Sequence, residues 1–419
     1  MSRGVASGPP GAAEPPFVEP TATPTPAAEV EGRLARFRVT LRERELDAAL
    51  IVQNADLFYF SGTVQQSYLH VPVEGEATLF VRRSVERARR ESPLERVVEL
   101  DGPRALTGAL RARAGGLPRR VGLELDVLPV TAYERLLGLL PGAEAEDVGR
   151  AIVRQRAVKS PYEIERIAAA AALADAVWEF APRVLRAGLT EAEFAGMVEA
   201  EARRLGHQGV IRMLGFNQEM FYGQLLTGPS ATAPSFLDTP LAGTGLSPAV
   251  AQGVSFRRIE PGDPIVFDFV AVREGYTADF TRMLSLGPLP EAVRDAYAVA
   301  LEAQAAVVAA ARPGVTCGAV YESAVAIAER RGLGANFMGC GPEQVRFIGH
   351  GVGLELDELP VLTTSDVPLE EGMVFALEPK FVLPGVGAVG VENTFVVERD
   401  GLRALTRAPE EPVEVPISA

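Results

Sequence analysis

Four carboxylates and one histidine in the second half of the chain have the types and order of a metal site. They are Asp268, Asp279, His350, Glu378 and Glu392, with successive spacings of 11, 71, 28 and 14 residues. Four carboxylates and one imidazole suit hard or borderline divalent ions such as Mn, Co, Fe or Zn. Two such ions a few ångström apart activate a bridging water and stabilise an oxyanion. The set therefore predicts two divalent ions and a hydrolytic enzyme.

The residues around each ligand support this interpretation. Asp268 lies in the apolar run 264–270, where an unpaired carboxylate is costly to bury and metal ligation removes that cost. His350 lies between two glycines, whose small size lets a backbone pass close to an ion or a substrate. Glu378 and Glu392 end or interrupt apolar strand patterns. Each acid alone has another explanation, such as a turn carboxylate, but five residues in this order favour a metal site.

Asp279 has two interpretations. It follows a Gly-Tyr turn and precedes Thr281 and Arg282. It is either a ligand held in place by neighbouring polar groups, or a solvated turn carboxylate paired with Arg282.

The series D-x10-D, GHG-x-GL, EP and ENT resembles the pita-bread metallopeptidases, which include methionine aminopeptidase, prolidase, Xaa-Pro aminopeptidase and the non-peptidase creatinase. The resemblance covers roughly residues 30–410 and is closest to the prolidase and Xaa-Pro branch, because a further domain precedes the metal half. It implies an α/β amino-terminal domain and an α+β pita-bread carboxy-terminal domain.

The resemblance also implies a mechanism and an assembly. The five residues would bind two divalent ions (Mn, Co, Fe or Zn), and a water bridging these ions would attack a peptide or amide carbonyl. Glu378 would be catalytic, because its matching family position moves a proton while it ligates. The chain would form a homodimer.

The match is weaker around the substrate. Peptidase members usually carry a second histidine seven residues after the ligand histidine, and here Asp357 takes that place. A neutral imidazole donates a hydrogen bond to a carbonyl or a developing oxyanion, whereas an ionised carboxylate only accepts. We therefore expect Asp357 to take part in catalysis by contacting a cationic or hydroxyl group of the substrate. The alternative is that the site raises the pKa of Asp357 enough to keep it protonated, in which case it would still donate a hydrogen bond. Cleavage of ordinary Xaa-Pro dipeptides should be weak.

Two further positions differ from the family pattern. A family histidine upstream of the first ligand is replaced by Ser235, or by Ala251 if an insertion is left out of the count. Prolidase-like members often have an arginine two residues before the last glutamate, where this chain has Gly390. His70 and His207 are the remaining histidines; either can be an ordinary structural residue or can enter the site, His70 from a partner subunit.

The segment 205–253 is predicted to form a pocket wall. It is rich in Gly, Pro, Ser and Thr, and long loops of compact domains are often functional. Its interleaved aromatic residues argue against disorder. From this segment and from the ENT motif we expect three substrate-binding side chains: Ser235, Tyr222 and Thr394.

Three functions remain open. The first is a metal-dependent hydrolase of the Xaa-Pro aminopeptidase or dipeptidase type, acting on a small peptide or amide. The second is a creatinase-like hydrolase or lyase acting on a non-peptide small molecule. The third is a non-catalytic module that binds metal or a partner, which the retention of all five ligands disfavours. The missing histidines separate the first function from the second.

Composition sets the broad class. The chain has 419 residues, 47% hydrophobic and 23% charged, which fits a soluble globular protein of two domains. A formal net charge of −14 argues against binding to nucleic acid or to an acidic membrane surface. The sequence has no run of about 18 apolar residues and no apolar signal segment. Cys317 and Cys340 fit a reducing compartment, so we expect a cytoplasmic protein.

The pattern of elements predicts the domain boundaries. Residues 1–28 are rich in Pro, Ala, Gly and Thr and are predicted to be a disordered tail. Residues 29–155 alternate short apolar strands with helical patterns, as in an α/β layer. Residues 156–412 should form the metallohydrolase domain. Its helices are predicted at about 161–181, 190–205, 290–311 and 316–332.

Overall fold

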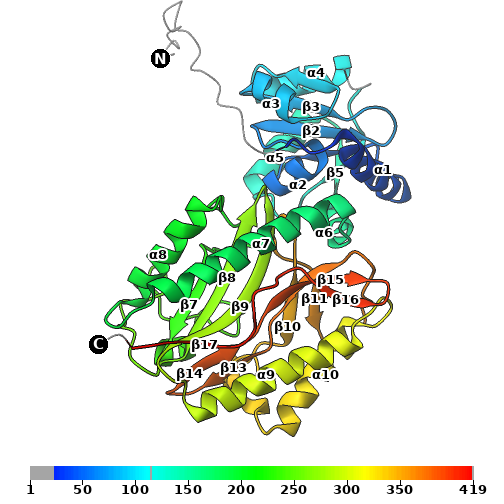
Figure 1. Cartoon of the computed structure of the whole chain (residues 1–419). Helices are drawn as coiled ribbons and strands as arrows, with labels where there is room; N and C mark the ends of the chain where they lie inside the picture. Colours follow the sequence, from blue (N-terminus) through cyan, green and yellow to red (C-terminus); the bar gives the residue numbers. More distant parts are fainter. Residues whose placement is uncertain (1–22, 114–115, 418–419) are drawn as a thin grey trace, which may run out of the picture.

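The chain folds as a smaller sheet domain followed by a larger one (Figure 1). The structure, a computed structural model, describes residues 23–113 and 116–417. Most of the predicted disordered tail therefore lies outside the described residues. Helix α1 (Ala27–Glu43) begins at Ala27, so the last two residues assigned to that tail are helical.

A six-stranded mixed sheet forms the amino-terminal domain. Its strand order is β4-β3-β2-β1-β5-β6, with β1 antiparallel to β2 and parallel to β5. All four residues of β1 are buried, as expected for a central strand covered on both faces. The strands are β1 (Ala48–Ile51), β2 (Ser67–Pro72), β3 (Thr78–Val81), β4 (Arg96–Glu99), β5 (Arg120–Leu123) and β6 (Glu144–Asp147). The helices that follow α1 are α2 (Asn54–Ser61), α3 (Val85–Glu91), α4 (Leu106–Arg113), α5 (Val130–Leu139) and α6 (Gly149–Ala157).

Two sheets and a two-stranded ladder form the second domain. One sheet has the order β17-β9-β8-β7, the other has the order β11-β10-β12-β15-β16, and β13 pairs with β14. The first sheet contains β7 (Gly223–Thr227), β8 (Ile265–Arg273), β9 (Tyr276–Leu286) and β17 (Val413–Val415). The second contains β10 (Phe347–Val352), β11 (Leu356–Thr363), β12 (Val374–Leu377), β15 (Asn393–Glu398) and β16 (Gly401–Ala404). The ladder consists of β13 (Lys380–Leu383) and β14 (Gly387–Gly390).

Four long helices pack against these sheets (Figure 1). α7 (Pro161–Val184) and α8 (Glu191–Arg204) contact β7, β8 and β9, whereas α9 (Glu291–Ala310) and α10 (Cys317–Arg330) contact the other strands. The four predicted helices are thus confirmed. Trp178 of α7 packs edge-on against Phe267 of β8, with ring centroids 5.5 Å apart, so α7 fixes the strand that carries Asp268. Among the described residues, no helix is both long enough and apolar enough to cross a membrane.

The segment 205–253 is not a loop throughout. It contains β7, which pairs with β8 so that Gln224 lies opposite Asp268. The sequence did not indicate this strand because its five residues begin with a glycine and are followed directly by a Gly-Pro turn. The segment nevertheless reaches the pocket that holds the predicted ligands, through Met213, Gln218, Met220, Gln224 and residues 237–239.

Arg156 of α6 joins the two domains. Its guanidinium donates to Asp56 of α2 (2.7 Å), lies 2.8 Å from a Glu355 carboxylate oxygen, and also donates to Glu358 of β11. Lys159 Nζ lies 3.1 Å from the other oxygen of Glu358. These charges are buried and paired, as buried charges must be. These ion pairs hold the amino-terminal domain against the second domain. Helix α6 itself crosses the predicted domain boundary between residues 155 and 156.

Candidate metal centre

Strand pairing brings the five predicted ligands to one pocket. Asp268 lies on β8 and Asp279 on the adjacent antiparallel strand β9. His350 lies on β10, Glu378 directly follows β12, and Glu392 lies between β14 and β15. All five side chains line the same small cavity of about 60 Å³. Residues from distant parts of the sequence thus meet where the two sheets face each other.

The two glycines beside His350 let neighbouring strands approach. A Cβ on Gly349 would lie 2.2 Å from the carbonyl oxygen of Ala376 in β12. A Cβ on Gly351 would lie 2.3 Å from the carbonyl oxygen of Leu359 in β11. Any side chain at these positions would push β10 away from one of its neighbours. The GHG motif therefore seats the imidazole close to both strands.

His350 points Nε2 at the carboxylates. Its Nδ1 lies 3.3 Å from the Gly351 carbonyl oxygen and 3.4 Å from Asp357 Oδ1. Its Nε2 lies 3.8 Å from Asp279 Oδ2 and 3.6 Å from Glu378 Oε1. With the proton assigned to Nδ1 and donated to these oxygens, Nε2 keeps its lone pair for a metal, as the partners of metal-binding histidines usually ensure.

Two buried carboxylate oxygens at the site have no hydrogen-bond partner within the described part of the chain. They are Asp279 Oδ1 and Glu392 Oε1. Buried polar atoms are normally paired, so two unpaired carboxylate oxygens mark a place where a cation belongs. One ligand atom from each of Asp279, His350 and Glu392 lies within 4.8 Å of the others. These three residues therefore fit a divalent ion.

Hydroxyl groups and one arginine hold the ligands in place. Thr281 Oγ1 donates to Glu392 Oε2 (2.7 Å). Thr394 Oγ1 accepts from the Asp279 N–H (2.9 Å) and donates to the Asp279 carbonyl (2.8 Å). Arg282 Nη1 donates to the Glu392 carbonyl oxygen (2.7 Å). Asp279 is 4% exposed, so its interpretation as a solvated turn residue paired with Arg282 does not fit.

Sequence reasoning missed Lys380, whose ammonium lies among the ligands. It begins β13 and is 2% exposed. Its Nζ lies 2.7 Å from Asp268 Oδ2, 2.6 Å from Glu378 Oε2 and 3.1 Å from Glu392 Oε2. Burial opposes the charge, but the attraction of these three carboxylates outweighs it and raises the pKa of Lys380 well above its usual value. The available signal was a lysine two residues after a predicted ligand, at the start of an apolar strand.

The Asp279 side of the cluster is short of positive charge. Burial, followed by the charges of Glu392 and Asp268, raises the pKa of Asp279 well above its usual value. Burial also raises the pKa of Asp268, although Lys380 works in the opposite direction. A divalent ion beside Asp279 would supply the missing charge.

Comparison with known proteins identifies the family. Residues 165–399 match Metallopeptidase family M24, and residues 33–158 match the Creatinase/Prolidase N-terminal domain. The chain belongs to metallopeptidase family M24. The Xaa-Pro dipeptidase of Pyrococcus horikoshii is 31% identical over 376 residues, which cover 88% of this chain and 95% of that protein. The Xaa-Pro dipeptidase of Pyrococcus furiosus is 30% identical over 383 residues, which cover 90% and 99%.

Solved structures share the M24 fold. The prolidase from Pyrococcus horikoshii has a TM-score of 0.76 and 27% identity, and the match covers 91% of this chain and 99% of that one. The X-Pro aminopeptidase from Thermotoga maritima has a TM-score of 0.76 and 26% identity, with coverage of 89% and 99%. The predicted architecture, an α/β domain followed by an α+β pita-bread domain, is confirmed. The chain is a peptidase-type hydrolase of this family.

Asp357 lies at the mouth of the M24 pocket. Its side chain is 40% exposed, and Oδ1 lies 3.4 Å from His350 Nδ1. The residue lines the pocket together with the ligands. Its φ of 64° places it in the left-handed region, which turns the side chain out of the regular pleat of β11. Asp357 therefore reaches both the ligand histidine and the solvent through which a substrate would enter.

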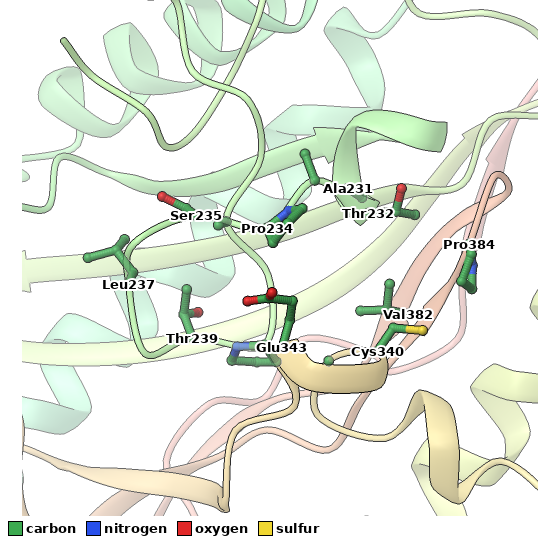
Figure 2. A pocket seen from close by; sticks show the side chains of 14 residues that line it. Ala231, Thr232, Pro234, Ser235, Leu237, Thr239, Cys340, Glu343, Val382 and Pro384 are labelled. Atoms are coloured by element: carbon green, nitrogen blue, oxygen red, sulfur yellow. The ribbon is translucent and has the colours of Figure 1, made fainter. Parts of the chain in front are cut away.

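Ser235 lines a neighbouring cavity rather than the ligand pocket. This cavity of about 240 Å³ lies between the loop of Ser235 and the turn that carries Cys340 (Figure 2). Ser235 Oγ donates to the carbonyl oxygen of Ala251, so the two alternative positions of the missing histidine are in contact. Neither Ser235 nor Ala251 is one of the described residues that line the ligand pocket. Leu237 and Thr239 line both cavities and separate them.

Tyr222 and Thr394 lie behind the ligands. The Tyr222 ring packs on His207 and Phe269, with centroid distances of 4.6 Å and 6.2 Å. Thr394 is fully buried, and the Asp279 backbone uses its hydroxyl both as donor and as acceptor. Sequence reasoning expects both residues to bind substrate. Their contacts instead support positioning roles: Thr394 orients Asp279, and Tyr222 supports the strand that carries Asp268.

Neither of the other two histidines reaches the pocket within this chain. His207 Nε2 lies 3.0 Å from the Val270 carbonyl oxygen, and its Nδ1 accepts from the Gly209 N–H (2.9 Å). Both ring nitrogens are therefore used in structural contacts. His70 is buried in the sheet of the amino-terminal domain, opposite Leu50 of β1.

Gln224 is a second pocket residue that sequence reasoning missed. It lines the ligand pocket beside Asp268. Its side chain is buried, and within the described residues neither the amide oxygen nor the nitrogen has a hydrogen-bond partner. A side-chain amide can both donate and accept, so Gln224 has free capacity to bind a substrate carbonyl. No sequence signal marks Gln224, because its strand lies in a segment whose Gly, Pro, Ser and Thr content is typical of a loop.

Proposed function

We propose that the chain is a metal-dependent hydrolase of the Xaa-Pro aminopeptidase type, which cleaves small peptides from their amino end. The observation that carries this proposal is the pair of unpartnered oxygens, Asp279 Oδ1 and Glu392 Oε1, grouped with His350. The similarity to Xaa-Pro dipeptidases supports the peptide substrate.

The ligand residues have separate roles in this proposal. A divalent ion supplies a Lewis acid and lowers the pKa of a bound water towards neutrality. Asp279, His350 and Glu392 hold it. Glu378 would accept a proton from this water and pass it to the leaving amine. Its Oε1 faces the metal position at 3.6 Å from His350 Nε2, while its Oε2 is fixed by Lys380. The five residues predict two ions of Mn, Co, Fe or Zn, and Lys380 competes for one of the two positions.

The charge of the pocket favours a substrate that carries an ammonium group. Six carboxylates line it, from Asp238, Asp268, Asp279, Asp357, Glu378 and Glu392. Of the described residues that line this pocket, none is an arginine, and Lys380 is engaged with three of the carboxylates. A free carboxylate near the scissile bond would be repelled, whereas an amino terminus would be attracted. We therefore propose that Asp357 binds the amino terminus and that peptides with a blocked or distant carboxyl end are preferred.

A dipeptide needs more room than the pocket offers. The ligand pocket has a cavity of about 60 Å³. Pockets for small molecules usually span about 300–1,000 Å³. The neighbouring cavity of about 240 Å³ shares the wall that contains Leu237 and Thr239. We propose that substrate entry displaces this wall and joins the two cavities.

Matched substrates test the proposal. The purified protein is supplied with Mn²⁺ and assayed on Ala-Pro, on Ala-Pro amide and on Ala-Pro-Ala. We expect cleavage of the amide and of the tripeptide, at least about tenfold faster than cleavage of Ala-Pro, because roughly 1.4 kcal/mol of repulsion gives that ratio. Chelator-treated protein is the control. If none of the three peptides is cleaved, peptidase function is rejected. If all three are cleaved at equal rates, the preference for the amino end is rejected.

Asp357 also favours a second candidate, a creatinase-like hydrolase or lyase acting on a cationic small molecule. Of the described residues that line the pocket, His350 is the only histidine, so the imidazole donors of ordinary peptidases are missing. A protein that binds metal but cleaves no peptide would support this candidate. It should then release amine or ammonia from one of a panel of guanidino and amide compounds.

We also propose that the chain is a cytoplasmic homodimer. The pocket-wall segment exposes Phe216 (91%) and Phe236 (66%), and large exposed apolar side chains often mark an interface. Light scattering at micromolar concentration should give the mass of two chains. A monomer mass would reject the dimer without affecting the proposed chemistry.

A further inference from the structure

Three carboxylates of the ligand set converge on the Lys380 ammonium. Its Nζ donates to Asp268 Oδ2 at 2.7 Å, to Glu378 Oε2 at 2.6 Å and to Glu392 Oε2 at 3.1 Å. An ammonium has three N–H donors, so one bond to each carboxylate satisfies the group completely. The lysine side chain is 3% exposed, which makes this an interior arrangement rather than a surface ion pair.

A divalent ion held by the same three residues would need the same space. Bonds from such ions to carboxylate oxygens are about 2.0–2.2 Å long. An ion placed between Asp268, Glu378 and Glu392 would therefore overlap the ammonium nitrogen, which lies 2.6–3.1 Å from their oxygens. Two cations at this separation also repel each other strongly where water is excluded. The ammonium and an ion in this position exclude each other.

The opposite side of the cluster has room for an ion. Asp279 Oδ1 and Glu392 Oε1 have no partner among the described residues, and His350 belongs to the same compact group. Glu392 spans both positions, because its Oε2 binds Lys380 and its Oε1 is unpaired. Asp268 is outside this group.

We infer that Lys380 is a built-in cation that replaces one of the two metal ions, so that the centre binds a single divalent ion between Asp279, His350 and Glu392. Asp268 then serves chiefly as a partner of the lysine, whereas Glu378 binds the lysine through Oε2 and keeps Oε1, which faces His350, for the proposed proton transfer. The inference rests on the proposed function, because it assumes that the cluster binds metal. It changes the expected number of ions from two to one.

The number of bound ions tests the inference without measuring activity. Metal-free protein is prepared with a chelator, loaded with Mn²⁺ and passed through a desalting column, and the bound metal is counted by elemental analysis. We expect one ion per chain in the wild type. Lys380→Ala should bind two, because the ammonium and most of its stem are gone. Lys380→Met fills most of the space without charge and should bind one.

Electron paramagnetic resonance supplies an independent reading. Wild type should give the spectrum of an isolated Mn²⁺ ion, and Lys380→Ala the spectrum of an exchange-coupled pair. Lys159→Ala is the matched control, since Lys159 is also buried and ion-paired but contacts Glu358 outside the ligand pocket. This variant should bind one ion.

The outcomes separate the inference from the proposed function. Two coupled ions in the wild type would overturn the inference and leave the metallopeptidase proposal standing. One ion in both the wild type and Lys380→Ala would also overturn it, because the lysine would not then hold the second position. No ion in any variant would overturn both. If Lys380→Ala proves insoluble, the wild-type count and spectrum decide: one isolated ion supports the inference, and two ions reject it.

Discussion

Lys380 and Gly390 face each other across the β13–β14 ladder, and a Cβ on Gly390 would lie 2.4 Å from Lys380 Cγ. Gly390 stands where prolidase-like sequences often carry an arginine. The missing side chain gives the lysine stem its room. The two unusual residues are therefore one structural feature, in which the stem passes over the glycine and the ammonium reaches the carboxylates.

The first prediction is that Gly390→Ala destabilises the chain because of Lys380. The new methyl group would press on Cγ, near the backbone, where the stem cannot move aside freely. Overpacking of this kind costs about 1–3 kcal/mol. Lys380→Ala in the same chain should remove most of that cost, with a coupling of at least about 1 kcal/mol between the two changes. Urea unfolding of the two single variants and the double variant measures this coupling, and additive effects would contradict it.

A glycine in open space is the matched control. Nothing lies within 4 Å of a Cβ built on Gly196 in α8. Alanine is the better helix former by about 1 kcal/mol, so Gly196→Ala should be neutral or stabilising.

The convergence of the five predicted ligands on one pocket could be anticipated because each stands in a local sequence pattern. The five predicted ligands each stand in a distinctive stretch of sequence. The start of α7 carries capping residues, with Ser160 directly before the helix and Pro161 and Glu163 in its first turn. Alternating strand and helix patterns were enough to give the order of the two domains. These features depend on neighbouring residues, which the sequence shows directly.

The features that escaped prediction depend on contacts between distant residues. A lysine at the start of a strand is usually exposed to water. Lys380 is buried, with its side chain directed towards the carboxylates, because β14 pairs with β13 and places Gly390 opposite it. Gln224 became a pocket residue only when β7 paired with β8. The ENT motif predicts that Thr394 contacts the substrate because the motif contains a predicted ligand, but the Thr394 hydroxyl faces the Asp279 backbone. Residue spacing carries no information about such directions.

The second prediction distinguishes the two aspartates of the cluster. Loss of an outer partner of a metal ligand typically costs about 10–100-fold in affinity, so loss of a ligand should exceed about 100-fold. Asp279→Asn should therefore lose more than about 100-fold in Mn²⁺ affinity. Asp268→Asn should lose about tenfold or less, because its carboxylate binds Lys380. Calorimetric titration measures both values, and equal losses would show that both aspartates hold the ion.

The third prediction concerns the junction between the domains. Arg156 is buried among Asp56, Glu355 and Glu358, and Arg156→Ala would leave these carboxylates without their main counter-ion. Breaking a buried pair costs about 3–5 kcal/mol, so we expect a loss of that size in urea unfolding. Arg42→Ala is the matched control, because the exposed pair of Arg42 with Glu74 should contribute at most about 1 kcal/mol. Similar losses in the two variants would contradict the prediction.

The fourth prediction is a pH dependence caused by His70. Burial lowers its pKa from 6.5 to about 4, and its Nδ1 has no partner among the described residues. Between these values the unfolded chain takes up a proton that the folded chain does not, so stability is complete above about pH 6.5 and falls as the pH drops towards 4. The slope from this one group is at most about 1.4 kcal/mol per pH unit.

The contribution of His70 is measured as a difference, because other groups titrate in the same range. Urea unfolding at pH 7 and at pH 5 is compared between the wild type and His70→Gln, which has no titrating side chain. The variant should lose less stability than the wild type over this interval. The same loss in both proteins would mean that His70 does not carry the effect.

The last prediction concerns Asp357 and the end of the substrate. Asp357→His restores an imidazole that can donate a hydrogen bond, and the loss of one such donor typically costs about 10²–10³ in rate. We expect the rate on Ala-Pro to rise at least about tenfold, which on a logarithmic scale is half of the smaller of these two values. Asp357→Ala removes the negative charge without adding a donor, so it should reduce only the preference for Ala-Pro amide over Ala-Pro.

Because Asp357 lies 3.4 Å from His350 Nδ1, bound Mn²⁺ is counted in each variant to exclude loss of the ion. If the amide-to-acid ratio of kcat/KM is the same in all three proteins, Asp357 does not face the substrate, and the amino-end preference must come from the carboxylates deeper in the pocket.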